Sequence, residues 1–160
     1  MTKEELLKIY SAYLPYGLEI GLSDEGIYNL DSEYPNEHAH KTGIITEFTI
    51  SNGEFGYGEF KVSEKYYFSF NELSEVKPVI YPLEYLTKEI EHEGRSVCFL
   101  MEIDKKHPFN CTYQEMAEHI KTMNIDLMPF WLLKELLKYH FNVFNLLEDQ
   151  YINKATLTNK

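Results

Sequence analysis

The chain has 160 residues, of which 26 are acidic and 15 are basic, and its formal net charge is −11. This length is sufficient to bury a core without a metal or a disulfide, and it predicts one domain over residues 1–160. Arg95 is the single arginine and no lysine cluster accompanies it, which argues against direct binding to nucleic acid or to an anionic membrane.

The N-terminal half predicts one helix followed by strands. Thr2 and Glu5 form a capping-box pattern at the start of a helix over residues 2–14. The Asn52-Gly53 dipeptide predicts a tight hairpin turn, because both of its positions favour a positive φ. Residues 17–70 therefore predict a mainly β region, an antiparallel meander or small half-barrel, with strands over 17–22, 27–30, 43–51, 54–62 and 65–70.

The second half, residues 82–150, predicts mainly helices. A helix begins at Pro82 and continues to about Glu91, and the apolar run at 96–103 predicts one strand. Thr112 and Glu115 form a second capping box. A long helix follows over residues 128–150, with an apolar stripe of Leu133, Leu136, Leu137, His140, Phe144 and Leu147. The fold class is therefore α+β, with an N-terminal helix, the meander and C-terminal helices.

Three stretches carry a resemblance: "YLPYGLEI" at 13–20, "VKPVIYPLEYLTKEIE" at 76–91 and "LLKYHFNVFNLLEDQYINKATL" at 136–157. Together they resemble an uncharacterised family of small proteins encoded in phages, prophages and mobile elements of Bacteroidetes. Members read like "YLPYGL", "KPILRPLSDLTKEI" and "WHFDVFGLIEKGLAIDINTL". The resemblance implies a genetic context and no activity.

This chain departs from the family pattern at three positions. Tyr81 replaces the usual Arg, Asn142 the usual Asp, and Asn145 the usual Gly. Because Asn is the residue after Gly that best tolerates a left-handed helix end, the last substitution predicts a break in the final helix near Asn145.

Two closely spaced histidines are candidate metal ligands. His38 and His40 on a strand would point the same way, as in metal-binding barrels. Such sites also need a carboxylate three or four residues further on and another histidine in a later strand. Here Glu47 comes only after six intervening residues, and the second half of the motif is missing. A solvated loop is the favoured interpretation. His140 is interpreted as a core residue, and Trp131 as a core or subunit-contact residue. No catalytic, cofactor-binding or metal-binding residue is nominated, because Walker, dinucleotide-binding and nucleophile-elbow motifs are absent.

Three functions remain open. The favoured one is a non-enzymatic phage or mobile-element accessory or adaptor protein, which binds a protein with a basic surface through the acidic N-terminal region. Residues 1–60 contain 11 acidic residues against 3 lysines. The alternatives are an acidic decoy that mimics nucleic acid to inhibit a DNA-binding or defence protein, and a small metal-binding barrel using His38 and His40. The lack of a signal-peptide pattern and of a Cys-x-x-Cys pair predicts a cytoplasmic location.

Overall fold

The structure is a computed structural model, and it describes residues 1–24, 26, 42–63 and 66–157. The chain divides into two compact units. Unit 1 contains Met1–Val79 and Leu147–Ile152, and unit 2 contains Ile80–Leu146 and Asn153–Lys160. An N-terminal helix, a mostly antiparallel sheet and C-terminal helices confirm the α+β class. The predicted strand at 27–30 lies outside the described residues.

Unit 1 begins with helix α1, Lys3–Tyr13, and its N-terminal cap is the predicted one. The Glu5 amide donates to the Thr2 hydroxyl at 3.1 Å, and the Thr2 amide donates to the Glu5 carboxylate at 2.7 Å. Tyr10 is fully buried, its ring stacks with Phe48, and its hydroxyl donates to the Val76 carbonyl at 2.8 Å. Burial raises the pKa of the Tyr10 hydroxyl, so the ring stays neutral and attaches α1 to the sheet.

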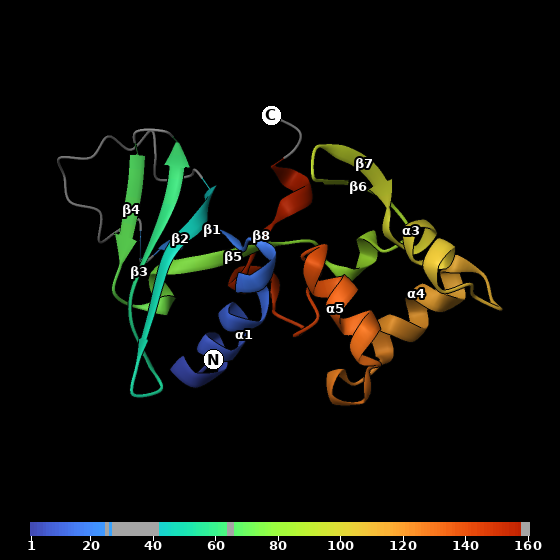
Figure 1. Cartoon of the computed structure of the whole chain (residues 1–160), viewed down its shortest axis with the longest axis horizontal. Helices are drawn as coiled ribbons and strands as arrows, with labels where there is room; N and C mark the ends of the chain where they lie inside the picture. The colour runs from blue at the N-terminus through green and yellow to red at the C-terminus, as the bar shows by residue number, and fades with distance from the viewer. Residues whose placement is uncertain (25, 27–41, 64–65, 158–160) are drawn as a thin grey trace. The chain divides into compact units, whose positions relative to one another are not determined.

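The sheet of unit 1 has the strand order β4-β3-β2-β1-β5-β8 (Figure 1). Strands β2, β3 and β4 are the antiparallel meander that the sequence predicts, and β1 joins β2 to β5. Among the described strands, β4 and β8 are the two edges, so the sheet stays open and does not close into a barrel. The bounds are β1 Glu19–Leu22, β2 Thr42–Ser51, β3 Glu54–Ser63, β4 Tyr66–Phe70, β5 Val76–Ile80 and β8 Ile152–Asn153.

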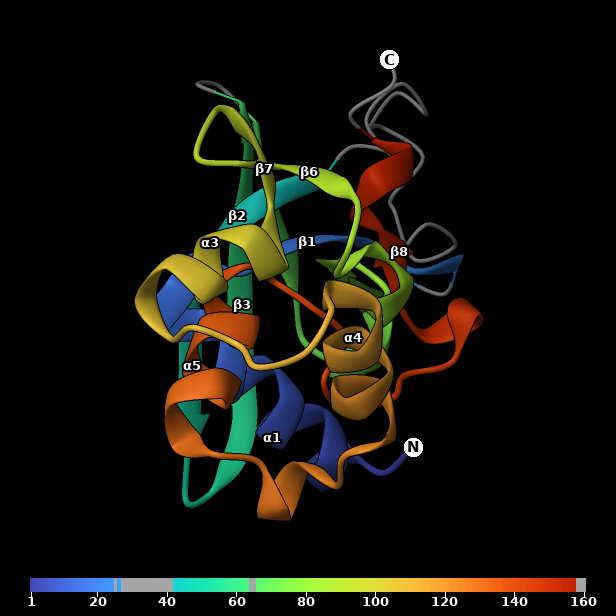
Figure 2. The ribbon, with the colours of Figure 1, turned by 90° about the vertical axis from the view of Figure 1, so that its right-hand side faces the viewer.

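The long hairpin of β2 and β3 is visible in Figure 2. It turns at the predicted dipeptide, where Asn52 has φ 54° and Gly53 has φ 81°. The pairing of β3 with β2 shifts at Gly56, which is an extra residue on β3, and the pairing of β3 with β4 shifts between Lys61 and Ser63. One face of the hairpin and β4 carries stacked rings, with Phe60 facing Phe68 at 5.4 Å and Phe55 facing Phe70 at 5.4 Å. These aromatic pairs form the sheet side of the unit 1 core.

Unit 2 contains the short hairpin of β6 and β7 followed by three helices. Its elements are β6 Glu89–His92, β7 Arg95–Cys98, α3 Phe99–Lys106, α4 Tyr113–Thr122 and α5 Phe130–Lys138, with 3₁₀ turns at Leu83–Tyr85 (η4), Ile125–Leu127 (η5) and Lys154–Thr156 (η7). The capping box of Thr112 and Glu115 begins α4 as predicted. The 3₁₀ turns of unit 1 are Leu14–Tyr16 (η1), Leu73–Glu75 (η3) and Glu148–Gln150 (η6).

Two predictions within unit 2 were wrong. The segment after Pro82 forms one 3₁₀ turn and then β6, because Glu93 and Gly94 both adopt positive φ and close a hairpin onto β7. The predicted strand at 96–103 ends at Cys98, where α3 begins. Phe99, Leu100 and Ile103 then bury one face of a helix, and a short apolar run does not distinguish these two alternatives.

The predicted helix over 128–150 was also too long. Helix α5 ends at Lys138, and His140 and Asn145 adopt left-handed φ values of 59° and 53°. Asn145 does adopt the left-handed conformation that the sequence predicts, but α5 has already ended at Lys138, so the predicted position of the helix break was wrong. Of the predicted stripe, Leu136, Leu137 and His140 are buried, Leu133 and Phe144 are half-buried, and Leu147 is exposed.

Candidate functional site

The negative charge of the chain is concentrated in unit 1. Its residues include 16 acidic and 6 basic side chains, for a net charge of −10, whereas unit 2 has 10 acidic and 9 basic side chains and a net of −1. The acidic region that the sequence places in residues 1–60 therefore belongs to one folded unit. A binding surface that depends on negative charge is best sought there.

The sheet of unit 1 carries opposed carboxylates on the face away from the aromatic core. Glu47 on β2 and Glu59 on β3 are directly paired in the register, and Glu59 is paired in turn with Ser69 on β4. Phe60 and Phe68, one position along, point into the core, so strand alternation directs Glu59 and Ser69 to the opposite side. We call this surface the acidic face; it consists of Glu47, Tyr57, Glu59 and Ser69.

Hydroxyl groups fix one of the two carboxylates. Thr46 donates to Glu59 Oε1 at 3.2 Å, and Tyr57 donates to Glu59 Oε2 at 3.4 Å, while the Tyr57 and Ser69 hydroxyls are 3.1 Å apart. Within the described part of the chain, neither Glu47 nor Glu59 forms a salt bridge. Like charges placed directly opposite one another destabilise a sheet, so a cation from outside would relieve this repulsion.

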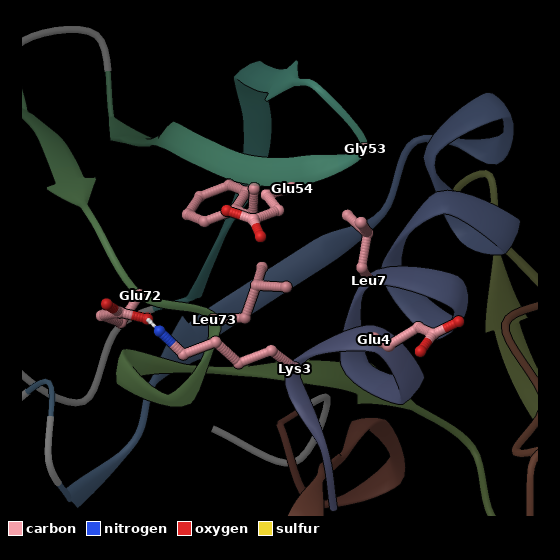
Figure 3. A pocket seen from close by; sticks show the side chains of 8 residues that line it. Lys3, Glu4, Leu7, Gly53, Glu54, Glu72 and Leu73 are labelled. Atoms are coloured by element: carbon pink, nitrogen blue, oxygen red, sulfur yellow. Dashed lines mark ion pairs between the residues drawn. The ribbon is translucent and has the colours of Figure 1, made fainter.

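A pocket of about 520 Å³ lies between α1, the β2–β3 turn and η3 (Figure 3). We call it the α1–hairpin pocket. Helix α1 provides its first wall, the hairpin turn its second, and the segment at the start of η3 its third. The lining residues are Lys3, Glu4, Leu7, Gly53, Glu54, Phe55, Glu72 and Leu73.

The pocket has an apolar interior and a charged rim. Leu73 is buried, and Leu7 and Phe55 are half-buried. On the rim, Lys3 Nζ lies 2.6 Å from Glu72 Oε2, although both side chains are largely exposed, at 81% and 50%. The hydrogen bond and the charge of Glu72 raise the pKa of Lys3, and Glu54 contributes in the same direction.

Local hydrogen bonds position these rim residues. The capping box at Thr2 sets the start of α1, from which Lys3 extends to Glu72. The backbone amides of Asn71 and Glu72 donate to Glu75 Oε2 at 2.8 and 3.1 Å, which holds the turn that carries Glu72. The sequence did not predict this pocket, because its walls come from three distant segments; the capping box and the Asn52-Gly53 turn were local signals for two of the walls.

The candidate metal ligands His38 and His40 lie outside the described residues. Among the residues that the structure does describe, no group of three or more His, Cys, Asp or Glu side chains could hold a metal ion. Glu47, the carboxylate considered with them, faces Glu59 across the hairpin.

Three of the other histidines, His140, His107 and His92, have side-chain partners. His140 is buried, as the sequence predicts, and its Nδ1 lies 3.3 Å from Lys154 Nζ. His107 stacks on Trp131 with ring centroids 4.2 Å apart, which gives both residues a partner that the sequence did not indicate. His92 stacks on Tyr139 at 4.0 Å.

Similarity to known proteins does not indicate a function for this chain. No protein family, no curated protein and no solved structure matches the chain. Over the described residues, no helix is long and apolar enough to cross a membrane.

Proposed function

We propose that the protein is a non-enzymatic adaptor, encoded on a phage or mobile element as the resemblance implies, that binds a partner protein with a basic surface. The observation that carries the proposal is the directly opposed pair of Glu47 and Glu59 on the acidic face, with no salt bridge to either among the described residues. A sheet tolerates such a pair at a cost in stability, and a lysine or arginine of a partner recovers that cost.

The hydroxyls beside Glu59 support the same proposal. Thr46 and Tyr57 hold the Glu59 carboxylate in a fixed position before any partner arrives. A preorganised carboxylate loses less conformational freedom on binding than a mobile one. Tyr57 also adds an aromatic ring, and tyrosine is enriched among the residues that contribute most to protein interfaces.

The acidic decoy would need carboxylates repeated in a regular row. On the described strands, the cross-strand row next to the opposed pair contains a lysine, an isoleucine and a tyrosine, namely Lys61, Ile44 and Tyr67. The negative charge is therefore interrupted within one residue pair. For this reason we propose the adaptor in preference to the decoy.

The test is affinity capture on the immobilised full chain from a lysate of cells that carry the gene, followed by binding measurements on the purified partner. Replacing both Glu47 and Glu59 by Gln should weaken binding roughly tenfold, the loss of about one charge-assisted hydrogen bond. The expected partner has a basic surface and dissociates at high salt, because surface charges are screened.

The matched control removes the same charge from unit 2, by Glu84→Gln together with Asp126→Asn; both side chains are exposed. This variant should bind like the wild-type chain. Equal affinity for the partner in all three proteins, or capture that persists unchanged at high salt, would contradict the proposal and indicate an apolar interface elsewhere.

A further inference from the structure

We infer that the α1–hairpin pocket binds an arginine side chain of a partner protein. The pocket combines an apolar interior with a rim of net negative charge, and arginine combines an apolar stem with a cationic, planar head group. The identity of the partner rests on the proposed function, whereas the choice of side chain rests on the pocket alone.

The interior of the pocket suits the stem of such a side chain. Leu7 on α1 and Leu73 in η3 extend toward the same space in Figure 3, and Phe55 adds an aromatic ring to the lining. The volume of about 520 Å³ falls within the range of pockets that enclose small ligands. A hydrated inorganic cation would gain nothing from these apolar side chains, so the walls favour an organic cation.

The rim supplies the charge that the head group needs. It carries three carboxylates, Glu4, Glu54 and Glu72, against the single ammonium group of Lys3. Lys3 is paired with Glu72, whereas Glu4 and Glu54 form no salt bridge within the described part of the chain. The rim therefore has a net charge of two negative units, which disfavours anions and leaves Glu54 free to accept hydrogen bonds from an arriving cation.

Arginine fits better than lysine for two reasons. Its guanidinium is more weakly hydrated than an ammonium, so it enters a partly apolar pocket at a lower desolvation cost. Its planar group can also stack on an aromatic ring such as Phe55 while it donates to a carboxylate. An occupant of this kind competes with Lys3 for Glu72 and pairs with Glu54.

The probe is N-acetyl-arginine methylamide, titrated into the isotopically labelled full chain and followed by NMR. We expect saturable shifts of the amides of Leu7, Gly53 and Leu73, with a dissociation constant of about 1 mM for so small a ligand. The citrulline analogue has the same shape without the charge, and it should bind about tenfold more weakly.

Two rim variants give changes of opposite sign. Glu54→Gln should weaken binding of the probe about tenfold, because it removes the unpaired carboxylate. Lys3→Met should tighten binding, because it removes the cation that competes for Glu72. Both side chains are exposed, so neither change threatens the fold.

The acidic-face variant separates this inference from the proposed function. Replacing Glu47 and Glu59 by Gln should leave the affinity for the probe unchanged, because neither residue lines the pocket. The inference is overturned by an absence of saturable shifts, by equal binding of the citrulline analogue, or by Glu54→Gln and Lys3→Met proteins that bind like the wild type.

Discussion

His92 is a half-buried ring whose surroundings favour its neutral form. Its Nε2 atom is buried and has no hydrogen-bond partner among the described residues, and the ring stacks on Tyr139. Glu93 Oε1 lies 3.8 Å away, too far for a hydrogen bond, and its side chain is 61% exposed. Burial therefore outweighs the attraction of Glu93 and lowers the pKa of His92.

This pKa shift predicts a loss of stability in acid. The unfolded ring has the ordinary value of 6.5, so below that pH the unfolded chain binds a proton that the folded chain resists. The free energy of unfolding should fall as the pH decreases through 6.5 toward the lower folded value. The charged groups that act on the ring are Glu93, Lys138, Lys154 and Arg95.

Urea denaturation at a series of pH values checks this, with His92→Phe as the comparison. Phenylalanine keeps the stack on Tyr139 and does not titrate. The wild-type chain should lose more stability between neutral and mildly acidic pH than the variant. Identical pH profiles would show that protonation of His92 is not resisted in the folded chain.

At the scale of elements, the β2–β3–β4 meander depends on a close approach between Gly58 and Phe70. The two residues are paired across β3 and β4. A Cβ atom at Gly58 would overlap the Phe70 ring, which also contacts the rings of Phe55 and Phe60. Phe70 is buried, so it has no free space into which to move.

Gly58→Ala should therefore destabilise unit 1 by about 1–3 kcal/mol, the usual cost of overpacking a core. Gly56→Ala on the same strand is the matched control. A Cβ there would meet nothing closer than the Thr49 carbonyl oxygen at 3.7 Å, so we expect a change within about 0.5 kcal/mol. Denaturant unfolding of both variants makes the measurement, and equal losses would exclude the Phe70 contact as the cause.

The elements that the sequence predicted correctly carry local signals. The capping boxes begin α1 and α4, and the Asn52-Gly53 pair turns the longest hairpin. Helix α5 ends early for a reason that is not local. The backbone amide of Tyr81 donates to the His140 carbonyl, and the backbone amide of Asn142 donates to the Tyr81 carbonyl, both at 2.8 Å. This distant strand segment takes the backbone groups that a longer helix would need.

The loop that follows α5 is held by a side chain. The side-chain Nδ2 of Asn142 donates to the Leu146 carbonyl, and its Oδ1 accepts from the Leu146 backbone amide, each at 2.9 Å. The sequence pattern predicted the left-handed conformation of Asn145 but not these hydrogen bonds between Asn142 and Leu146. The α1–hairpin pocket escaped prediction for the same physical reason: Lys3, Glu54 and Glu72 meet only after the sheet and α1 have packed together.

At the scale of the whole molecule, we expect the negative charge to disfavour nucleic acid as a partner. The net charge of −11 repels phosphates, and Arg95 is the only arginine available to read a base edge. Unit 2 is close to neutral, with 10 acidic and 9 basic side chains, so its net charge does not favour phosphate binding either.

We therefore expect no measurable binding of duplex DNA, single-stranded DNA or RNA at physiological salt. Fluorescence anisotropy of labelled oligonucleotides, repeated at low salt, is a direct test. A basic DNA-binding protein measured in parallel provides the positive control. Tight binding with a steep salt dependence would refute both the adaptor and the decoy functions.

The chain order of the two units has a consequence for biosynthesis. Unit 1 is discontinuous, because its last segment, Leu147–Ile152, follows the main part of unit 2. Tyr151 in that segment is buried, and β8 forms the sheet edge beside β5. Since a chain emerges from the ribosome N-terminus first, strand β5 is made long before its β8 neighbour exists. The nascent protein must therefore carry β5 as an unpaired sheet edge until residues 152–153 have been made.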